Sequence, residues 1–166
     1  MRKVIRNEAN LNIRAAPITK DAFAAFGDLI ATAPSGDRTE MTGIANRQTN
    51  PQFYMSTVRI PPSGPPLTIS VMERHAYSSQ SFLPLDAMRY LLCVAPSDPE
   101  GWPVTKSLRA FIVRQGTGIT YRAGTWHHPM IVLDSAASFA IMMWRGDDAI
   151  EEFVDLEHPI TIGVEY

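Results

Sequence analysis

Gly116-Thr-Gly-Ile-Thr-Tyr-Arg-Ala-Gly-Thr-Trp-His-His-Pro129 joins two segments that have strand character. The stretch begins at a glycine turn, continues through alternating residues at 119–122, and turns again at Ala123-Gly124. Two of the chain's four histidines, His127 and His128, then precede an apolar run at 130–133. Because neighbouring residues on a strand point to opposite faces, only one of these histidines can face any one site.

The spacing of this stretch resembles the second sequence motif of the cupins. Gly116, Gly124 and His127 occupy its fixed positions, and Arg122 stands where many cupins have proline. A plain hairpin that carries a surface histidine pair would contain the same residues. The motif therefore needs support from elsewhere in the chain.

Leu67–His75 supplies that support through its alternation. A period of two predicts that one face of a strand carries three apolar residues followed by two polar ones, namely Leu67, Ile69, Val71, Glu73 and His75. We expect this face to point inward, and the other face to carry Thr68, Ser70 and Arg74 outward. Glu73 and His75 would then enter a cavity together. The alternative is a strand end in solvent, where both would be ordinary surface groups.

Short strands separated by turns dominate the chain after residue 52. We expect strands at 53–60, 67–75, 88–95, 108–113 and 138–144, a brief helix within 147–153, and a loop or weak hairpin at 32–52. Residues 17–27 predict one short helix, capped by Thr19 and closed by Gly27. This pattern predicts a mostly-β fold, an antiparallel cupin-like β-barrel or jelly roll with a short N-terminal helix, in one domain over residues 1–166.

The composition of the chain excludes several classes of binding partner. The chain has 166 residues, 45% of them hydrophobic, and a formal charge of −2, which argues against nucleic acid or an anionic membrane as the main partner. No apolar run is long enough to cross a bilayer, and the N-terminal residues do not support a secretory signal. The single cysteine, Cys93, lies in an apolar run and is expected to be a buried core residue. A cytoplasmic protein that acts on a small molecule is the expectation.

Several longer pieces of sequence resemble the ureidoglycolate lyase family, whose members are cupin-like enzymes of allantoin and purine catabolism. The similar pieces are residues 18–30, Pro66-Leu-Thr-Ile69, Met72-Glu-Arg-His75 with Gln80, Phe82 and Pro84, Leu108-Arg-Ala-Phe-Ile112, and Trp126-His-His-Pro129. They cover most of the chain from 17 to 146. The resemblance implies a carbon–nitrogen lyase that splits ureidoglycolate into glyoxylate and urea.

Two segments depart from the family pattern. Residues 45–54 lack an Asn-Asn-Gly and an Arg-Tyr-His-Asp stretch, and Trp144 replaces an aspartate before Arg145-Gly146. If the replaced residues bind substrate in the family, this chain would act on a different small carboxylic acid. A cupin-fold enzyme or a binding protein for such an acid is therefore the alternative.

The implied reaction needs a base, an acid and a cation that binds the carboxylate. Glu73, His75 and His127 are the candidate catalytic residues, because burial and neighbours can bring such groups into the useful pKa range. The same three residues could hold a divalent metal, nickel or another first-row ion, and catalysis without a metal stays open. The candidate substrate-binding residues are Gln80, Arg109, Arg122 and His128, with Arg145 as a further cation. By analogy with cupins we also expect a homodimer.

Overall fold

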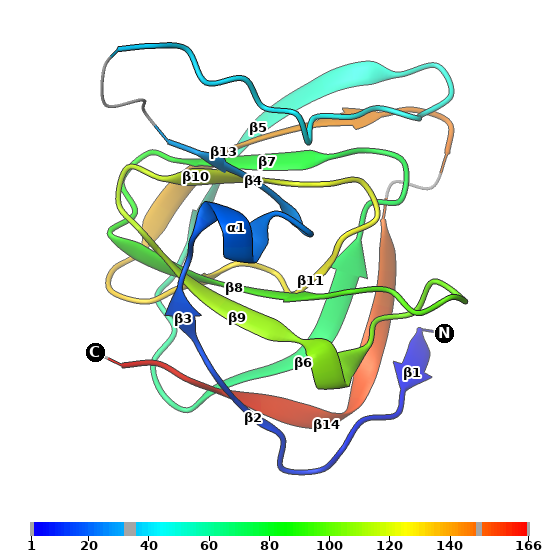
Figure 1. Ribbon diagram of the computed structural model, residues 1–166, viewed down its shortest axis with the longest axis vertical. Helices are drawn as coiled ribbons and strands as arrows, with labels where there is room; N and C mark the ends of the chain where they lie inside the picture. Colours follow the sequence, from blue (N-terminus) through cyan, green and yellow to red (C-terminus); the bar gives the residue numbers. More distant parts are fainter. Residues whose placement is uncertain (1, 32–35, 149–150, 166) are drawn as a thin grey trace.

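The computed structural model describes residues 2–31, 36–148 and 151–165, and it consists of two β-sheets stacked face to face (Figure 1). The larger sheet has the order β1 (Lys3–Ile5), β14 (Glu152–Gly163), β6 (Leu67–Arg74), β11 (Trp126–His127), β8 (Arg89–Ala95), β9 (Arg109–Arg114) and β3 (Ala16–Pro17). β2 (Asn12–Arg14) pairs with β14, and β12 (Ile131–Val132) pairs with β8. The smaller sheet has the order β4 (Gly27–Ile30), β10 (Gly118–Tyr121), β7 (Gln80–Pro84), β13 (Ala137–Arg145) and β5 (Gln52–Ile60).

This architecture confirms the mostly-β jelly-roll expectation. The pairs among β5 to β13 are antiparallel, whereas the three N-terminal strands β1, β2 and β3 join their neighbours in parallel. The two sheets do not join into a closed barrel, because β4 and β5 end the smaller sheet in the described part of the chain. Among the described residues, no helix is long and apolar enough to cross a membrane.

The predicted N-terminal helix is present but shorter than expected. α1 spans Lys20–Phe23, and the hydroxyl of Thr19 accepts a hydrogen bond from the backbone N–H of Ala22, as a capping residue does. Gly27 does not close the helix and instead begins β4, paired with Tyr121. A Cβ on Gly27 would lie 1.8 Å from the carbonyl oxygen of Thr120, so the close approach of β10 requires glycine there.

Two apolar cores lie on the two sides of the larger sheet. One core packs between the sheets and includes Phe23, Leu92, Ile119 and Phe139. The other core lies where the larger sheet curves, with β2 pairing to β14 and β3 pairing to β9 (Figure 1), and its members include Leu91, Cys93, Trp126 and Ile160. β8 contributes alternate residues to both cores, which makes it the central buried strand expected from its continuous apolar run.

The alternation predicted for β6 holds only in its first half. Leu67 and Ile69 are buried in the core of the curved sheet, but the next buried residue on that side is Met72 rather than Val71. The shift lies opposite an irregularity in β14 between Asp155 and Ile160. The single inward face predicted for Leu67, Ile69, Val71, Glu73 and His75 is therefore wrong, because the first two residues face one core and the last two face the other.

Two further segments complete the fold. Glu152–Gly163, part of which was expected to be helical, forms the long strand β14, which pairs with β6, β1 and β2. Residues 37–51 form the expected loop, with one isolated bridge between Asn46 and Ser78, while 32–35 lie outside the described residues. The loop packs against residues 77–79, through hydrogen bonds from Arg47 N to Tyr77 O and from Ser79 N to Ala45 O. It therefore lies beside the turn that separates His75 from Gln80.

Candidate active site

The opening stretch of the sequence crosses from one sheet to the other. β10 belongs to the smaller sheet and β11 to the larger one, and residues 122–125 form the corner between them. Gly124 has a positive φ of 84°, which favours glycine at this position. Its N–H donates to the carbonyl of His75 (2.8 Å), and the N–H of Arg122 donates to the carbonyl of Phe26 (2.9 Å). The corner thereby brings the end of β6 to the start of β11.

Glu73, His75 and His127 meet at this place. One potential ligand atom from each of the three lies within 4.8 Å of the others. Glu73 and His127 are direct cross-strand partners, and the imidazole centroids of His75 and His127 are 5.8 Å apart. Both histidines are buried, while the Glu73 side chain keeps 15% of its surface exposed. The carboxylate is thus the member of the cluster that solvent or a ligand can reach.

The hydrogen bonding of His127 defines its tautomer. Nδ1 lies 2.9 Å from the carbonyl oxygen of Thr125, and because a carbonyl only accepts, Nδ1 carries the proton. Nε2 then lies 3.2 Å from Oε1 of Glu73, without the alignment of a hydrogen bond. A lone pair that faces a carboxylate at this distance is stable only if a proton or a cation lies between them. The donor set therefore fits a first-row divalent ion, with the backbone contact fixing the imidazole as in many metal sites.

The charge state of Glu73 follows from two opposing effects. Burial raises the pKa of its carboxyl group, but the close contact with His127 and the charges of His75 and His128 outweigh burial and bring the pKa below its ordinary value of 4.5. The carboxylate is therefore ionised at neutral pH. It is available as a proton acceptor or as an anionic ligand.

The smaller sheet supplies the opposite wall of the site. The ring of Tyr121 stacks on the imidazole of His127, with centroids 4.1 Å apart and an interplanar angle of 18°. The Tyr121 hydroxyl is buried without a hydrogen-bond partner among the described residues, and so is Oε1 of Gln80. Burial raises the pKa of Tyr121 well above its ordinary value, so its hydroxyl stays protonated. The site therefore contains unused hydrogen-bonding groups.

Three predicted substrate-binding residues lie outside the cluster. The guanidinium of Arg109 donates to the carbonyl of Ala22 (2.8 Å) and lies over the ring of Phe111. Arg122 lies 3.7 Å from Asp28 and lines a separate surface hollow of about 280 Å³. His128 turns away from its neighbour, with Nδ1 2.8 Å from the carbonyl of Val71.

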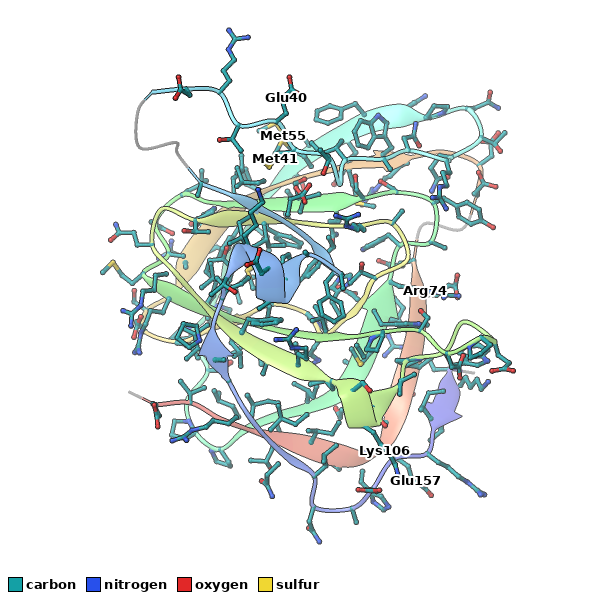
Figure 2. The ribbon with its side chains drawn as sticks, viewed as in Figure 1. Glu40, Met41, Met55, Arg74, Lys106 and Glu157 are labelled. Atoms are coloured by element: carbon teal, nitrogen blue, oxygen red, sulfur yellow. The ribbon has the colours of Figure 1, made fainter. Side chains whose placement is uncertain are left out.

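Arg74 confirms the expectation that it faces away from Glu73. Its guanidinium lies over the ring of Trp126, donates to Glu152 (2.9 Å), and is placed where β6 and β14 meet (Figure 2). The expectation that Arg74 points outward into solvent is wrong, because this side of β6 borders the core of the curved sheet. Arg74 is thus a packing residue on the far side of the strand.

The structure places further residues near the site that the sequence pattern does not single out. Sequence alternation does not single out Tyr121, because its position in the strand does not reveal that its ring stacks on a histidine from the other sheet. Arg145 lies over the ring of Tyr54, 3.6 Å from the centroid, and no carboxylate among the described residues pairs with it. Tyr54 pairs with Met143, which also pairs with Gln80, so these side chains share the inner face of the smaller sheet. Trp144 points to the outer face, where it contacts Phe53.

Comparisons with known proteins identify the family of the chain. A family model described as Ureidoglycolate lyase matches residues 10–162. A ureidoglycolate lyase of Pseudomonas fluorescens (strain Pf0-1) is 34% identical over 149 residues, which cover 82% of this chain and 88% of that protein. One from Brucella anthropi is 34% identical over 148 residues, covering 82% and 86%, and one from Burkholderia cepacia is 35% identical over 141 residues, covering 78% of each.

Similarity to solved structures is more distant. Lactobacillus farciminis oxalate decarboxylase, in a formate complex, superposes with a TM-score of 0.42 and 12% sequence identity. The match covers 75% of this chain and 30% of the decarboxylase chain. At this distance the resemblance does not bear on the site.

Proposed function

Because the chain belongs to the ureidoglycolate lyase family, we propose that it cleaves ureidoglycolate into glyoxylate and urea. The observation that carries the proposal is the convergence of Glu73, His75 and His127 within 4.8 Å, beside a wall of unpartnered polar groups. The enzyme is a carbon–nitrogen lyase. The carbinol C–N bond breaks, the hydroxyl oxygen becomes the aldehyde carbonyl of glyoxylate, and the hydroxyl proton ends on the leaving urea nitrogen.

Glu73 is the residue that moves this proton. Its carboxylate is ionised and is the exposed member of the cluster, so one of its oxygens can take the hydroxyl proton. The hydroxyl and the ureido nitrogen are bonded to the same carbon, so the same carboxyl group can return the proton to the nitrogen. His127 and His75 flank the carboxylate during both transfers.

We also propose a first-row divalent ion, nickel among them, as the cofactor. Nε2 of His127, the imidazole of His75 and one oxygen of Glu73 would hold it, which leaves the second oxygen of Glu73 for proton transfer. When bound, the ion would supply positive charge that polarises the carbinol oxygen.

Arg145 is the proposed partner of the substrate carboxylate. Its guanidinium is exposed, lies on the ring of Tyr54, and is free of ion pairs among the described residues, whereas Arg109 and Arg122 are held elsewhere. Tyr54 and Met143 connect it to Gln80 along the inner face of the smaller sheet. An arginine on an aromatic ring keeps its planar edge available for two parallel hydrogen bonds to a carboxylate.

Two properties of the whole protein complete the proposal. We propose a cytoplasmic location, consistent with a single, buried cysteine. We also propose a homodimer, for which the outer face of the smaller sheet is the candidate surface, because Phe53 and Met55 are exposed there (Figure 2 labels Met55). Sedimentation at several concentrations tests the assembly.

The activity is tested by incubating the purified protein with ureidoglycolate and measuring both products against the spontaneous rate. Urea and glyoxylate should appear in equal amounts, and Arg145→Met should raise KM with a smaller effect on kcat. Absence of enzyme-dependent urea release, together with turnover of another small acid, would contradict the proposal.

A further inference from the structure

Gln80 is a buried amide whose hydrogen-bonding capacity is almost unused. Only 8% of the residue is exposed, and Oε1 has no hydrogen-bond partner in the described part of the chain. Nε2 reaches the sulfur of Met143 at 3.9 Å, and a thioether is a weak acceptor. Because unmatched amide groups in the interior cost free energy, a ligand that offers one donor and one acceptor would be favoured here.

The amide borders the catalytic cluster. Gln80 is the cross-strand partner of Tyr121 on one side and of Met143 on the other, so the three side chains share one face of the smaller sheet. The ring of Tyr121 stacks on His127, which places this face against Glu73 and the two histidines. The Tyr121 hydroxyl, also buried without a partner, adds a further donor to the same wall.

We infer that Gln80 is the residue that selects the ureido group of the substrate, an inference that rests on the proposed function. A terminal ureido group presents an N–H donor beside a carbonyl acceptor. A primary amide presents the same pair in the reverse order, so two parallel hydrogen bonds can form: ureido N–H to Oε1, and Nε2–H to the ureido oxygen. Both unused functions of Gln80 are then satisfied at once.

This contact also orients the reaction. A ureido group held by β7 directs its remaining nitrogen, which carries the scissile C–N bond, toward the larger sheet. The Glu73 carboxylate on β6 is the group that must exchange a proton with that nitrogen. Gln80 therefore acts by positioning and selection, without taking part in proton transfer.

Two unreactive ligands isolate the contact from turnover. N-carbamoylglycine keeps the ureido and carboxylate groups but lacks the hydroxyl, so it cannot be cleaved. N-acetylglycine replaces the terminal NH₂ with a methyl group and leaves the rest of the ligand unchanged. By calorimetry, the wild-type protein should bind N-carbamoylglycine at least about tenfold more tightly, because a site that hydrogen-bonds an N–H discriminates against a ligand that lacks it.

Gln80→Leu and Gln80→Met should reduce that preference to within about twofold. Gln115→Leu, which removes an exposed amide in the turn before β10, should keep the wild-type preference. The methionine variant decides the question if the leucine variant does not fold, since an unbranched side chain adapts readily beside Met143. Wild-type discrimination that survives in a folded Gln80 variant overturns the inference.

The two proposals fail separately. A wild-type protein that cleaves ureidoglycolate but binds both ligands equally would overturn the role of Gln80 and leave the lyase activity intact. A wild-type protein that prefers N-carbamoylglycine through Gln80 but releases no urea would support the ureido contact and refute the lyase activity.

Discussion

Trp126 and His127 are neighbours on one short strand, yet their side chains enter two different environments. Trp126 is buried in the core of the curved sheet, its Nε1–H donates to the carbonyl of Gly101 (2.9 Å), and Arg74 covers its ring. On the other side, His127 lies beside Tyr121 and Gln80. Nε2 of His127, the hydroxyl of Tyr121 and Oε1 of Gln80 are all buried without a hydrogen-bond partner among the described residues. The polar groups on one side of β11 are satisfied by the protein itself, and the other side leaves polar atoms that a ligand could bind.

The two sides of β11 should therefore respond differently to substitution. Substitutions on the Trp126 side should destabilise the fold, because they remove packed apolar area. Substitutions on the His127 side should reduce activity at little cost in the stability of the metal-free protein, because they remove groups that the fold leaves unsatisfied.

The largest expected effect lies on the polar side. Glu73→Gln keeps the size of the side chain but removes the charge proposed to accept the proton, so the rate should fall by about 10²–10⁴-fold, while the melting temperature measured with a chelator should change little. Steady-state urea release measures the loss, and Glu100→Gln, an exposed carboxylate elsewhere, serves as the control. A Glu73→Gln enzyme that retains most of its activity would remove Glu73 from the reaction.

Trp126→Ala tests the apolar side. Truncation of a fully buried tryptophan should lower the free energy of unfolding by about 3–5 kcal/mol. Denaturant unfolding measures the change, and Trp144→Ala, on the outer face of the smaller sheet, should cost clearly less. Equal losses for the two variants would show that the core of the curved sheet does not carry the stability assigned to it.

Metal content should distinguish His127 from His128. The wild-type protein and His128→Ala should retain about one equivalent of a first-row divalent ion, and His127→Ala should lose it. An ion held by this cluster would bind only the folded state, so saturation at 100 times its Kd should stabilise the wild-type protein by about 2.7 kcal/mol, and a chelator should reverse this. Elemental analysis and melting curves provide the two readouts. The same trace metal level in all three proteins would contradict a metal site at the cluster.

The smallest expected effect is the reaction of the Cys93 thiol with an alkylating reagent. Burial raises the pKa of its thiol to about 12, so almost none of it is thiolate at pH 8. We expect no alkylation by iodoacetamide in the native protein and complete alkylation in denaturant, as followed by mass spectrometry. Rapid labelling of the folded protein would mean that the core of the curved sheet opens to solvent.

Part of this arrangement could be predicted from the sequence. The glycine turns before and after β10 and the position of His127 follow from local spacing, and the positive φ values of Gly116 and Gly124 agree with it. Glu73 and His75 were expected to share a face because they lie two residues apart. Their convergence with His127 was inferred correctly from these two local patterns.

The rest depends on contacts between distant segments. Alternation could not show that β6 changes faces near Val71, because the change accompanies an irregularity in its partner β14. β14 itself was missed, since its polar first residues resemble a helix start until β1 and β6 pair with it. Similarly, the sequence does not show which arginine is available to a ligand. In the structure Arg145 lies on the ring of Tyr54, whereas Arg109 donates a hydrogen bond to the carbonyl of Ala22.

We propose that His127, and not its neighbour His128, belongs to the catalytic cluster. The most direct test compares urea release by purified His127→Ala and His128→Ala proteins whose melting curves agree when both are recorded with a chelator. We expect His127→Ala to lose about 10²–10⁴-fold in rate and His128→Ala to lose far less, because Nε2 of His127 faces Glu73 while His128 contacts the backbone of Val71. Near-full activity of His127→Ala, or equal losses in both variants, would contradict the account.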